Sequence, residues 1–146
     1  MKKKVLVSAC LLGENCRHDG STKEIPEVSD ELRECEIIPF CPEHPVCGTP
    51  REKISVVEID GEMSLITDES NEDVTKLLTD EINSFIASNE DIHRIVLKSK
   101  SPSCGLGTTP ILNKDKEVIK HGDGLAAKIF KKHYKDILIQ DERTFF

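Results

Sequence analysis

Val5-Leu6-Val7-Ser8-Ala9-Cys10 is the stretch that decides the fold, because a short and continuous apolar run leads directly into a cysteine. Such a run is typical of a strand that is buried on both faces in a parallel sheet. The same succession occurs twice more, where β-rich runs are followed by Cys41 and by the loop that carries Cys104. Because the carboxyl ends of parallel strands meet at one edge of a sheet, we expect these cysteines to converge. The three predicted strands cover residues 3–9, 37–40 and 92–97.

Helices and hairpins fill the intervals between these strands. Residues 71–88 place apolar side chains at spacings of three and four, which indicates an amphipathic helix. Asp60-Gly61 lies between two β-rich runs and predicts a two-residue hairpin. The remaining predicted elements are helices at 26–33 and 125–134, a second hairpin at 110–119 and a last strand at 137–139. This order predicts an α/β fold: a single-domain three-layer sandwich over residues 1–146, with a mostly parallel central sheet and small β-hairpin excursions.

Length and composition exclude several classes of protein. With 146 residues the chain has room for one domain, and its 37% hydrophobic residues suffice for a core. No apolar run approaches the roughly 18 residues that span a bilayer, and the start of the chain does not resemble a secretory signal. The net charge of −7 disfavours nucleic acid as a partner. We therefore expect a cytoplasmic protein with reduced cysteines, whose oligomeric state the sequence leaves open.

The cysteines are the residues most suggestive of chemistry. The chain has 6 of them, and thiolates are soft ligands that select zinc, Cu(I) or iron–sulfur clusters. Zinc is the less favoured metal, because Cys10 to Cys16 and Cys41 to Cys47 each enclose five residues instead of the shorter spacing of zinc knuckles. Three thiolates on a cubane of four irons would leave one iron free to bind substrate as a Lewis acid. Burial as small apolar side chains is the structural alternative.

Six short motifs lie in order along nearly the whole chain: Ser8-Ala9-Cys10-Leu11-Leu12-Gly13, Cys16-Arg17-His18-Asp19-Gly20, Cys41-Pro42-Glu43, Thr49-Pro50-Arg51, Ser101-Pro102-Ser103-Cys104-Gly105 and Gly122-Asp123-Gly124. Together they resemble the thiouracil desulfurase family. The resemblance implies a [4Fe-4S] cluster on three cysteines and a non-redox reaction that removes sulfur from 2-thiouracil or a related thionated nucleobase. The partner it implies is therefore a small-molecule thionated pyrimidine.

Roles follow for the residues at the predicted strand ends. We assign Cys10, Cys41 and Cys104 as the cluster ligands. Glu43, two residues after Cys41, is the expected acid/base that takes a proton from water and returns one to the ring nitrogen, whereas the structural alternative is a solvated loop carboxylate. Ser101 either hydrogen-bonds the pyrimidine or the water, or forms the turn before Pro102.

For other residues of the motifs the sequence leaves alternative roles open. Cys16 is an alternative ligand, a sulfur acceptor or a thiol that lies beside the cluster. Ser8, Arg17 and Arg51 are expected to contact the substrate, although surface ion pairs explain the two arginines equally well. Cys35 and Cys47 are expected to lie outside the site.

Two departures from the family pattern bear on substrate choice. His18 stands where the motif generally has tyrosine, and residues 44–48 replace a turn that is usually rich in glycine. A zinc deaminase is disfavoured, because the His-x-Glu and Pro-Cys-x-x-Cys signature is absent. A sulfur or metal carrier, or a redox-sensing module that binds a labile cluster or zinc without turnover, remains the alternative function.

Overall fold

A parallel four-stranded sheet forms the centre of the molecule. The computed structural model describes residues 3–13, 24–43, 48 and 52–144. The strand order is β2-β1-β5-β8, and all three neighbouring pairs are parallel. The predicted parallel arrangement of the three strands that precede cysteines is therefore confirmed. The strands are β1 (Lys4–Ser8), β2 (Glu36–Phe40), β5 (Arg94–Leu97) and β8 (Leu138–Asp141).

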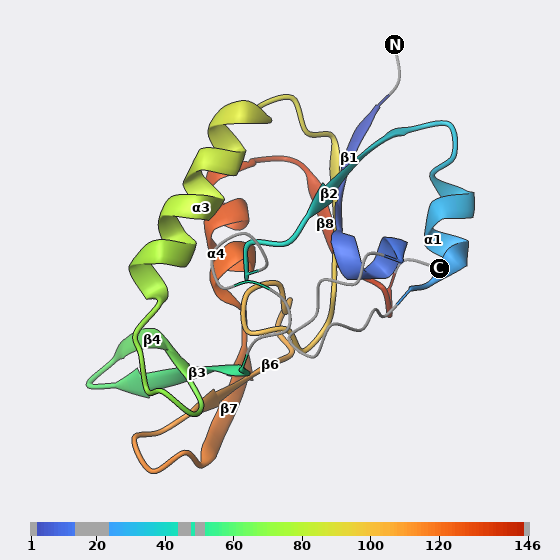
Figure 1. The fold of residues 1–146 in the computed structure, drawn as a ribbon. Helices are drawn as coiled ribbons and strands as arrows, with labels where there is room; N and C mark the ends of the chain where they lie inside the picture. Colours follow the sequence, from blue (N-terminus) through green and yellow to red (C-terminus); the bar gives the residue numbers. More distant parts are fainter. Residues whose placement is uncertain (1–2, 14–23, 44–47, 49–51, 145–146) are drawn as a thin grey trace.

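Helices cover both faces of this sheet, as a three-layer sandwich requires (Figure 1). Val5 and Val7 face the short helix α1 (Pro26–Glu31), whereas Leu6 between them packs in the cluster formed with α3 and α4. This alternation follows from the two-residue period of a strand. Helices α3 (Thr75–Ser88) and α4 (Leu125–His133) bring Ile82, Ile86 and Phe130 to the second face. The predicted α/β class and layered architecture are confirmed.

The two predicted hairpins are present, and they join to form a second four-stranded sheet. Their strands are β3 (Ile54–Ile59) with β4 (Glu62–Thr67) and β6 (Thr109–Leu112) with β7 (Val118–Gly122). The order is β4-β3-β6-β7, because β3 and β6 pair in parallel through Val56 and Ile111. This sheet packs on Leu78 of α3 and Leu125 of α4. The two hairpins thus form one continuous sheet, whereas the sequence predicted two separate hairpins beside the central sheet.

The helix predicted over residues 71–88 begins later than the periodicity indicates. Asp73 forms a β-bridge with Ile66, and the Val74 amide donates to the Leu65 carbonyl at 2.9 Å. The Thr75 hydroxyl in turn accepts a hydrogen bond from the Leu65 amide at 2.8 Å. Residues 71–74 therefore extend the second sheet, and pairing with β4 overrides their helical pattern.

Two further features complete the fold. A 3₁₀ turn, η1 (Ala9–Leu12), follows β1 and contains Cys10. Helix α1 ends at Glu31, two residues before the predicted end, and β5 begins at Arg94, two residues after the predicted start. Within the described ranges, no helix is both long enough and apolar enough to cross a membrane.

Candidate active site

A cavity of 560 Å³ lies between the two sheets, at the carboxyl ends of the parallel strands. Residues that follow β1, β2 and β5 form one side, and residues of β3 and β6 form the other. This is the edge where open α/β sheets bind their ligands. The first sheet therefore supplies one wall of the cavity, and the second sheet supplies the opposite wall.

Three thiols line this cavity, and we call Cys10, Cys41 and Cys104 the pocket cysteines. Cys10 lies in η1, Cys41 directly follows β2, and Cys104 lies in the loop after β5. Among the residues that the structure describes, no three His, Cys, Asp or Glu side chains form a group that could hold a single metal ion. The pocket cysteines thus share one cavity without forming a single-ion site. Thiols are nevertheless the donors that zinc and iron–sulfur centres take.

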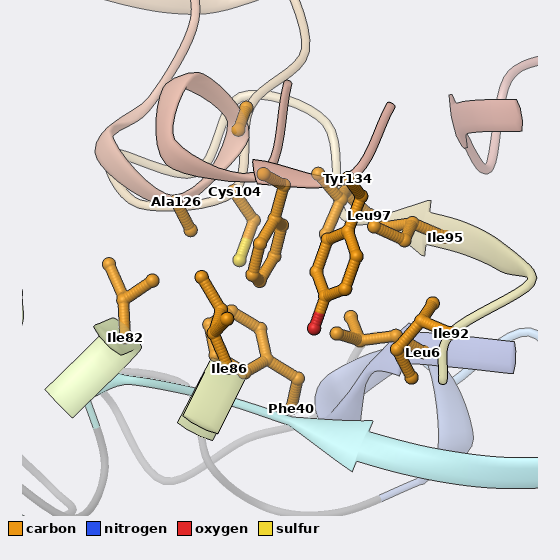
Figure 2. Packing of buried hydrophobic residues seen from close by; sticks show 12 residues of the cluster. Leu6, Phe40, Ile82, Ile86, Ile92, Ile95, Leu97, Cys104, Ala126 and Tyr134 are labelled. Atoms are coloured by element: carbon orange, nitrogen blue, oxygen red, sulfur yellow. The ribbon is translucent and has the colours of Figure 1, made fainter. Parts of the chain in front are cut away.

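Cys104 is the most enclosed of the pocket cysteines. Its side chain lies among Phe40, Ile82 and Ala126 of the main apolar cluster (Figure 2). Burial raises the pKa of the Cys104 thiol far above its ordinary range, an effect that hydrogen bonds with Ser8 and Ser101 only partly offset. Nearby Cys41 and Glu43 raise this pKa further. A thiolate here is therefore costly unless a cationic centre such as iron compensates its charge.

The loop that carries Cys104 is fixed on the N-terminus of α4. The amides of Leu125 and Ala126 donate to the carbonyls of Pro102 and Ser103 at 3.3 and 2.7 Å. These carbonyls satisfy helix amides that have no partner within the helix. Gly124 allows the close approach, because a Cβ there would lie 2.6 Å from the Ser103 carbonyl carbon. The Gly122-Asp123-Gly124 motif is thus a docking point for the cysteine loop.

Glu43 is a buried carboxylate in the same cavity, and its side chain comes from the segment after β2. The Ser103 hydroxyl donates to Glu43 Oε2 at 2.9 Å. Ser103 lies in the Ser101-Pro102-Ser103 motif, and the motif alone does not predict this contact. No local pattern predicts a hydrogen bond between the Ser103 hydroxyl and Glu43, which lies 60 positions earlier in the chain.

The hydroxyls of Ser8 and Ser101 also line the cavity and contact the cysteine loop. Ser8 Oγ accepts the Lys98 amide at 2.9 Å and hydrogen-bonds the Cys104 thiol. Ser101 Oγ accepts the amides of Ser103 and Cys104 at 3.2 and 3.0 Å, as a turn-forming serine does. The turn-forming interpretation of Ser101 is therefore confirmed, and its contact with substrate or water stays a prediction.

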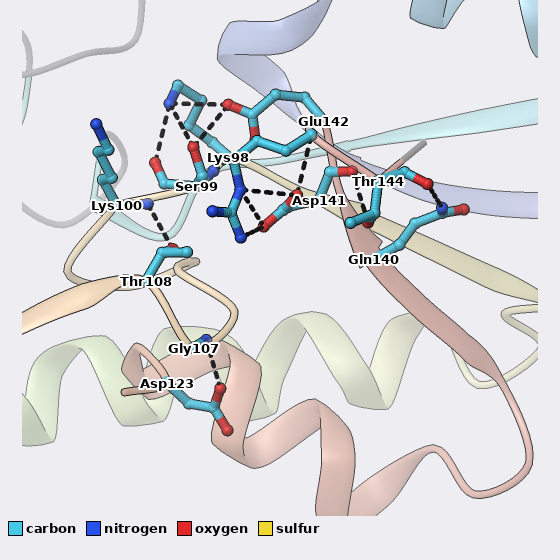
Figure 3. A network of polar contacts seen from close by, with 11 residues as sticks. Lys98, Ser99, Lys100, Gly107, Thr108, Asp123, Gln140, Asp141, Glu142 and Thr144 are labelled. Atoms are coloured by element: carbon cyan, nitrogen blue, oxygen red, sulfur yellow. Dashed lines mark hydrogen bonds and ion pairs between the residues drawn. The ribbon is translucent and has the colours of Figure 1, made fainter. Parts of the chain in front are cut away.

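A polar network supports one wall of the cavity (Figure 3). Lys98 Nζ contacts Glu142 Oε2 at 3.0 Å, and Glu142 also accepts the amide and hydroxyl of Ser99 at 2.7 and 2.8 Å. Burial alone would raise the pKa of Glu142, but these hydrogen bonds hold that pKa below its ordinary value. Lys98 and Ser99 line the cavity, so a carboxylate from the end of β8 fixes their positions. No local sequence pattern predicts this role for Glu142.

Several predicted site residues lie outside the described residues, and their assignments stay predictions. Cys35 is described, and it packs against the apolar cluster on the α1 face, away from the cavity lining. Of the residues discussed for the site, those outside the described ranges include Cys16, Arg17, His18, Cys47 and Arg51.

Comparison with known proteins identifies the family. The model of the 2-thiouracil desulfurase family matches residues 5–142. The chain belongs to the 2-thiouracil desulfurase family. It is 34% identical over 113 residues to the uncharacterized protein YbbK of Bacillus subtilis (strain 168), a match that covers 70% of this chain and 74% of YbbK. It is also similar to a solved structure described as the [4Fe-4S]-dependent thiouracil desulfidase TudS. That similarity has a TM-score of 0.71 and 30% identity, and it covers 99% of this chain and 93% of TudS. The resemblance found in the motifs is therefore confirmed.

Proposed function

We propose that this desulfurase-family protein hydrolyses 2-thiouracil or a related thionated nucleobase, with a [4Fe-4S] cluster held by the pocket cysteines. The observation that carries the proposal is that three thiols and a buried carboxylate line one cavity. Family membership and the similarity to TudS support the same chemistry. The reaction consumes water and yields the oxo base and hydrogen sulfide, so that carbon and sulfur keep their oxidation states.

The donor set of the cavity fits such a cluster. Each thiolate of a cubane cluster binds a different iron. The pocket cysteines therefore need to lie around the cluster, and their sulfur atoms do not need to reach a single metal ion. When bound on three thiolates, the cluster would supply one open iron, a Lewis acid that draws electron density from the thione and makes the adjacent ring carbon electrophilic. The enclosed position of Cys104 suits a ligand whose charge is compensated.

The protein contributes proton transfer and exclusion of bulk water. Glu43 lies in the cavity that the thiols line, which suits a group that accepts a proton from the attacking water and delivers one to the ring nitrogen. Ser101, Ser8 and the polar wall offer hydroxyls and charges that orient a flat heterocycle. The arginines of the earlier prediction, Arg17 and Arg51, are further candidates for holding its carbonyl oxygen.

Turnover of the purified protein tests this function. Protein prepared without oxygen is incubated with 2-thiouracil and, in parallel, with other thionated pyrimidines, and the oxo base and sulfide are quantified. We expect equal amounts of both products, without added reductant or oxidant. Cluster-containing protein that releases neither product from any of these bases would contradict the proposal and favour a carrier or redox-sensing role.

A further inference from the structure

The hydrogen bond between Ser103 and Glu43 is the feature of the cavity that the proposed function does not use. Ser103 is 0% exposed and Glu43 is 8% exposed, and their oxygen atoms lie 2.9 Å apart. A carboxylate only accepts hydrogen bonds, so Ser103 supplies the proton of this bond. In a buried setting water does not readily replace such a donor, so loss of the donor costs the carboxylate one hydrogen bond.

The backbone of Ser103 is held on both sides, which restricts the positions that its side chain can take. Its amide donates to Ser101 Oγ at 3.2 Å, and its carbonyl accepts the Ala126 amide at 2.7 Å. Gly124 lies close to this carbonyl, since a Cβ there would be only 2.6 Å from its carbon. A turn docked on a helix end therefore presents the Ser103 hydroxyl to the Glu43 carboxylate.

The hydrogen bond from Ser103 reaches Glu43 from a distant segment of the chain. It follows the end of β2 by three residues and lies where regular strand structure has ended. A glutamate side chain has three rotatable bonds, and the loss of rotamer entropy opposes fixing it in one conformation. A bond to a rigid partner thus favours one orientation of the Glu43 carboxylate in the cavity.

We propose that Ser103 is a positioning residue for the desulfuration reaction, which holds the Glu43 carboxylate in the orientation that proton transfer requires. The inference rests on the proposed function. Ser103 acts through Glu43 and is not assigned a contact with substrate. Removing its hydroxyl is therefore expected to slow the chemical step without weakening substrate binding.

Steady-state kinetics of Ser103→Ala test the inference directly. We expect kcat to fall about tenfold to a hundredfold, the scale of a misplaced catalytic group, with little change in KM and with wild-type iron content. Thr67→Val is the matched control, because it also removes a buried hydroxyl, one that accepts the Glu72 amide outside the cavity lining. This control is expected to keep the wild-type kcat.

A double-mutant cycle separates positioning from general damage. If Ser103 acts only through Glu43, adding Ser103→Ala to Glu43→Gln causes no further loss of kcat. A crystal structure of Ser103→Ala provides a readout independent of activity, and we expect the Glu43 side chain in a different rotamer. An unchanged rotamer with unchanged kcat would overturn the inference alone. Absence of turnover in the wild-type protein would instead overturn the proposed function, and the catalytic role of Ser103 with it.

Discussion

Replacing Gly124 with alanine tests whether the cysteine loop depends on close docking against α4. The added Cβ would lie 2.6 and 2.7 Å from the carbonyl carbon and oxygen of Ser103, and 2.8 Å from the carbonyl oxygen of Pro102. Gly124 has φ −70° and ψ 171°, which alanine adopts without strain, so any effect comes from the clash. All these neighbours are backbone atoms, so the loop itself has to move.

The cost follows from the contacts that this movement disturbs. Overpacking contributes about 1–3 kcal/mol. Loss of the hydrogen bonds from the Leu125 and Ala126 amides adds about 0.5–1.5 kcal/mol each. We therefore expect Gly124→Ala to lower the free energy of unfolding by about 2–6 kcal/mol. Each kcal/mol of destabilisation should lower Tm by about 3–5 °C.

Gly122→Ala is the matched control for this prediction. A Cβ at Gly122 would meet only Cδ1 of Ile111, at 2.9 Å, and this atom is the flexible end of a side chain. Its unfolding free energy should stay within about 1 kcal/mol of wild type. Thermal and urea unfolding of both variants, with iron content measured beside them, checks the prediction. Equal stability of the two variants would refute the argument that the cysteine loop is fixed by its contact with Gly124.

Three further predictions concern the chemistry and the polar wall. Serine at any pocket cysteine should abolish iron retention, whereas Cys35→Ser should keep it; a pocket variant with full iron content would remove that thiol from the ligand set. Glu43→Gln should keep the cluster and lower kcat by about 10²–10⁴-fold, and unchanged turnover would exclude Glu43 as acid/base. Because the folded pKa of Glu142 is depressed, its contribution to stability is present above the ordinary carboxyl pKa and is lost as pH falls through the folded value. Urea unfolding of Glu142→Gln should therefore show a deficit relative to wild type at pH 7 that shrinks in acid. Asp80→Asn, which removes the exposed Lys76–Asp80 pair, is the control and should show a smaller loss of stability. A stability deficit of Glu142→Gln that does not change with pH would contradict this prediction.

The parallel sheet and its cysteines could be predicted because their determinants are local. An apolar run that ends at Cys10 or Cys41 indicates both the strand and the position of the thiol. The parallel order then places the strand ends at one edge without any knowledge of side-chain contacts. Glu43 followed from Cys41 by adjacency, and it does line the cavity.

The remaining features depend on contacts between distant parts of the chain. Asp60-Gly61 predicts one hairpin, but nothing in that hairpin indicates that Val56 pairs with Ile111 to build the second wall of the cavity. Glu142 and Ser103 gain their contacts only when the chain is folded, with partners 43 and 60 residues away. Local patterns in the sequence therefore predict where the thiols lie. The contacts of Glu142 and Ser103 and the pairing of β3 with β6 become visible only in the folded structure.

The content of iron, acid-labile sulfide and zinc per chain, in protein purified without oxygen, tests the central claim most directly. A cluster on the pocket cysteines predicts about four irons and about four sulfides per chain. One zinc per chain without sulfide would contradict the proposed cluster and the desulfuration chemistry that depends on it.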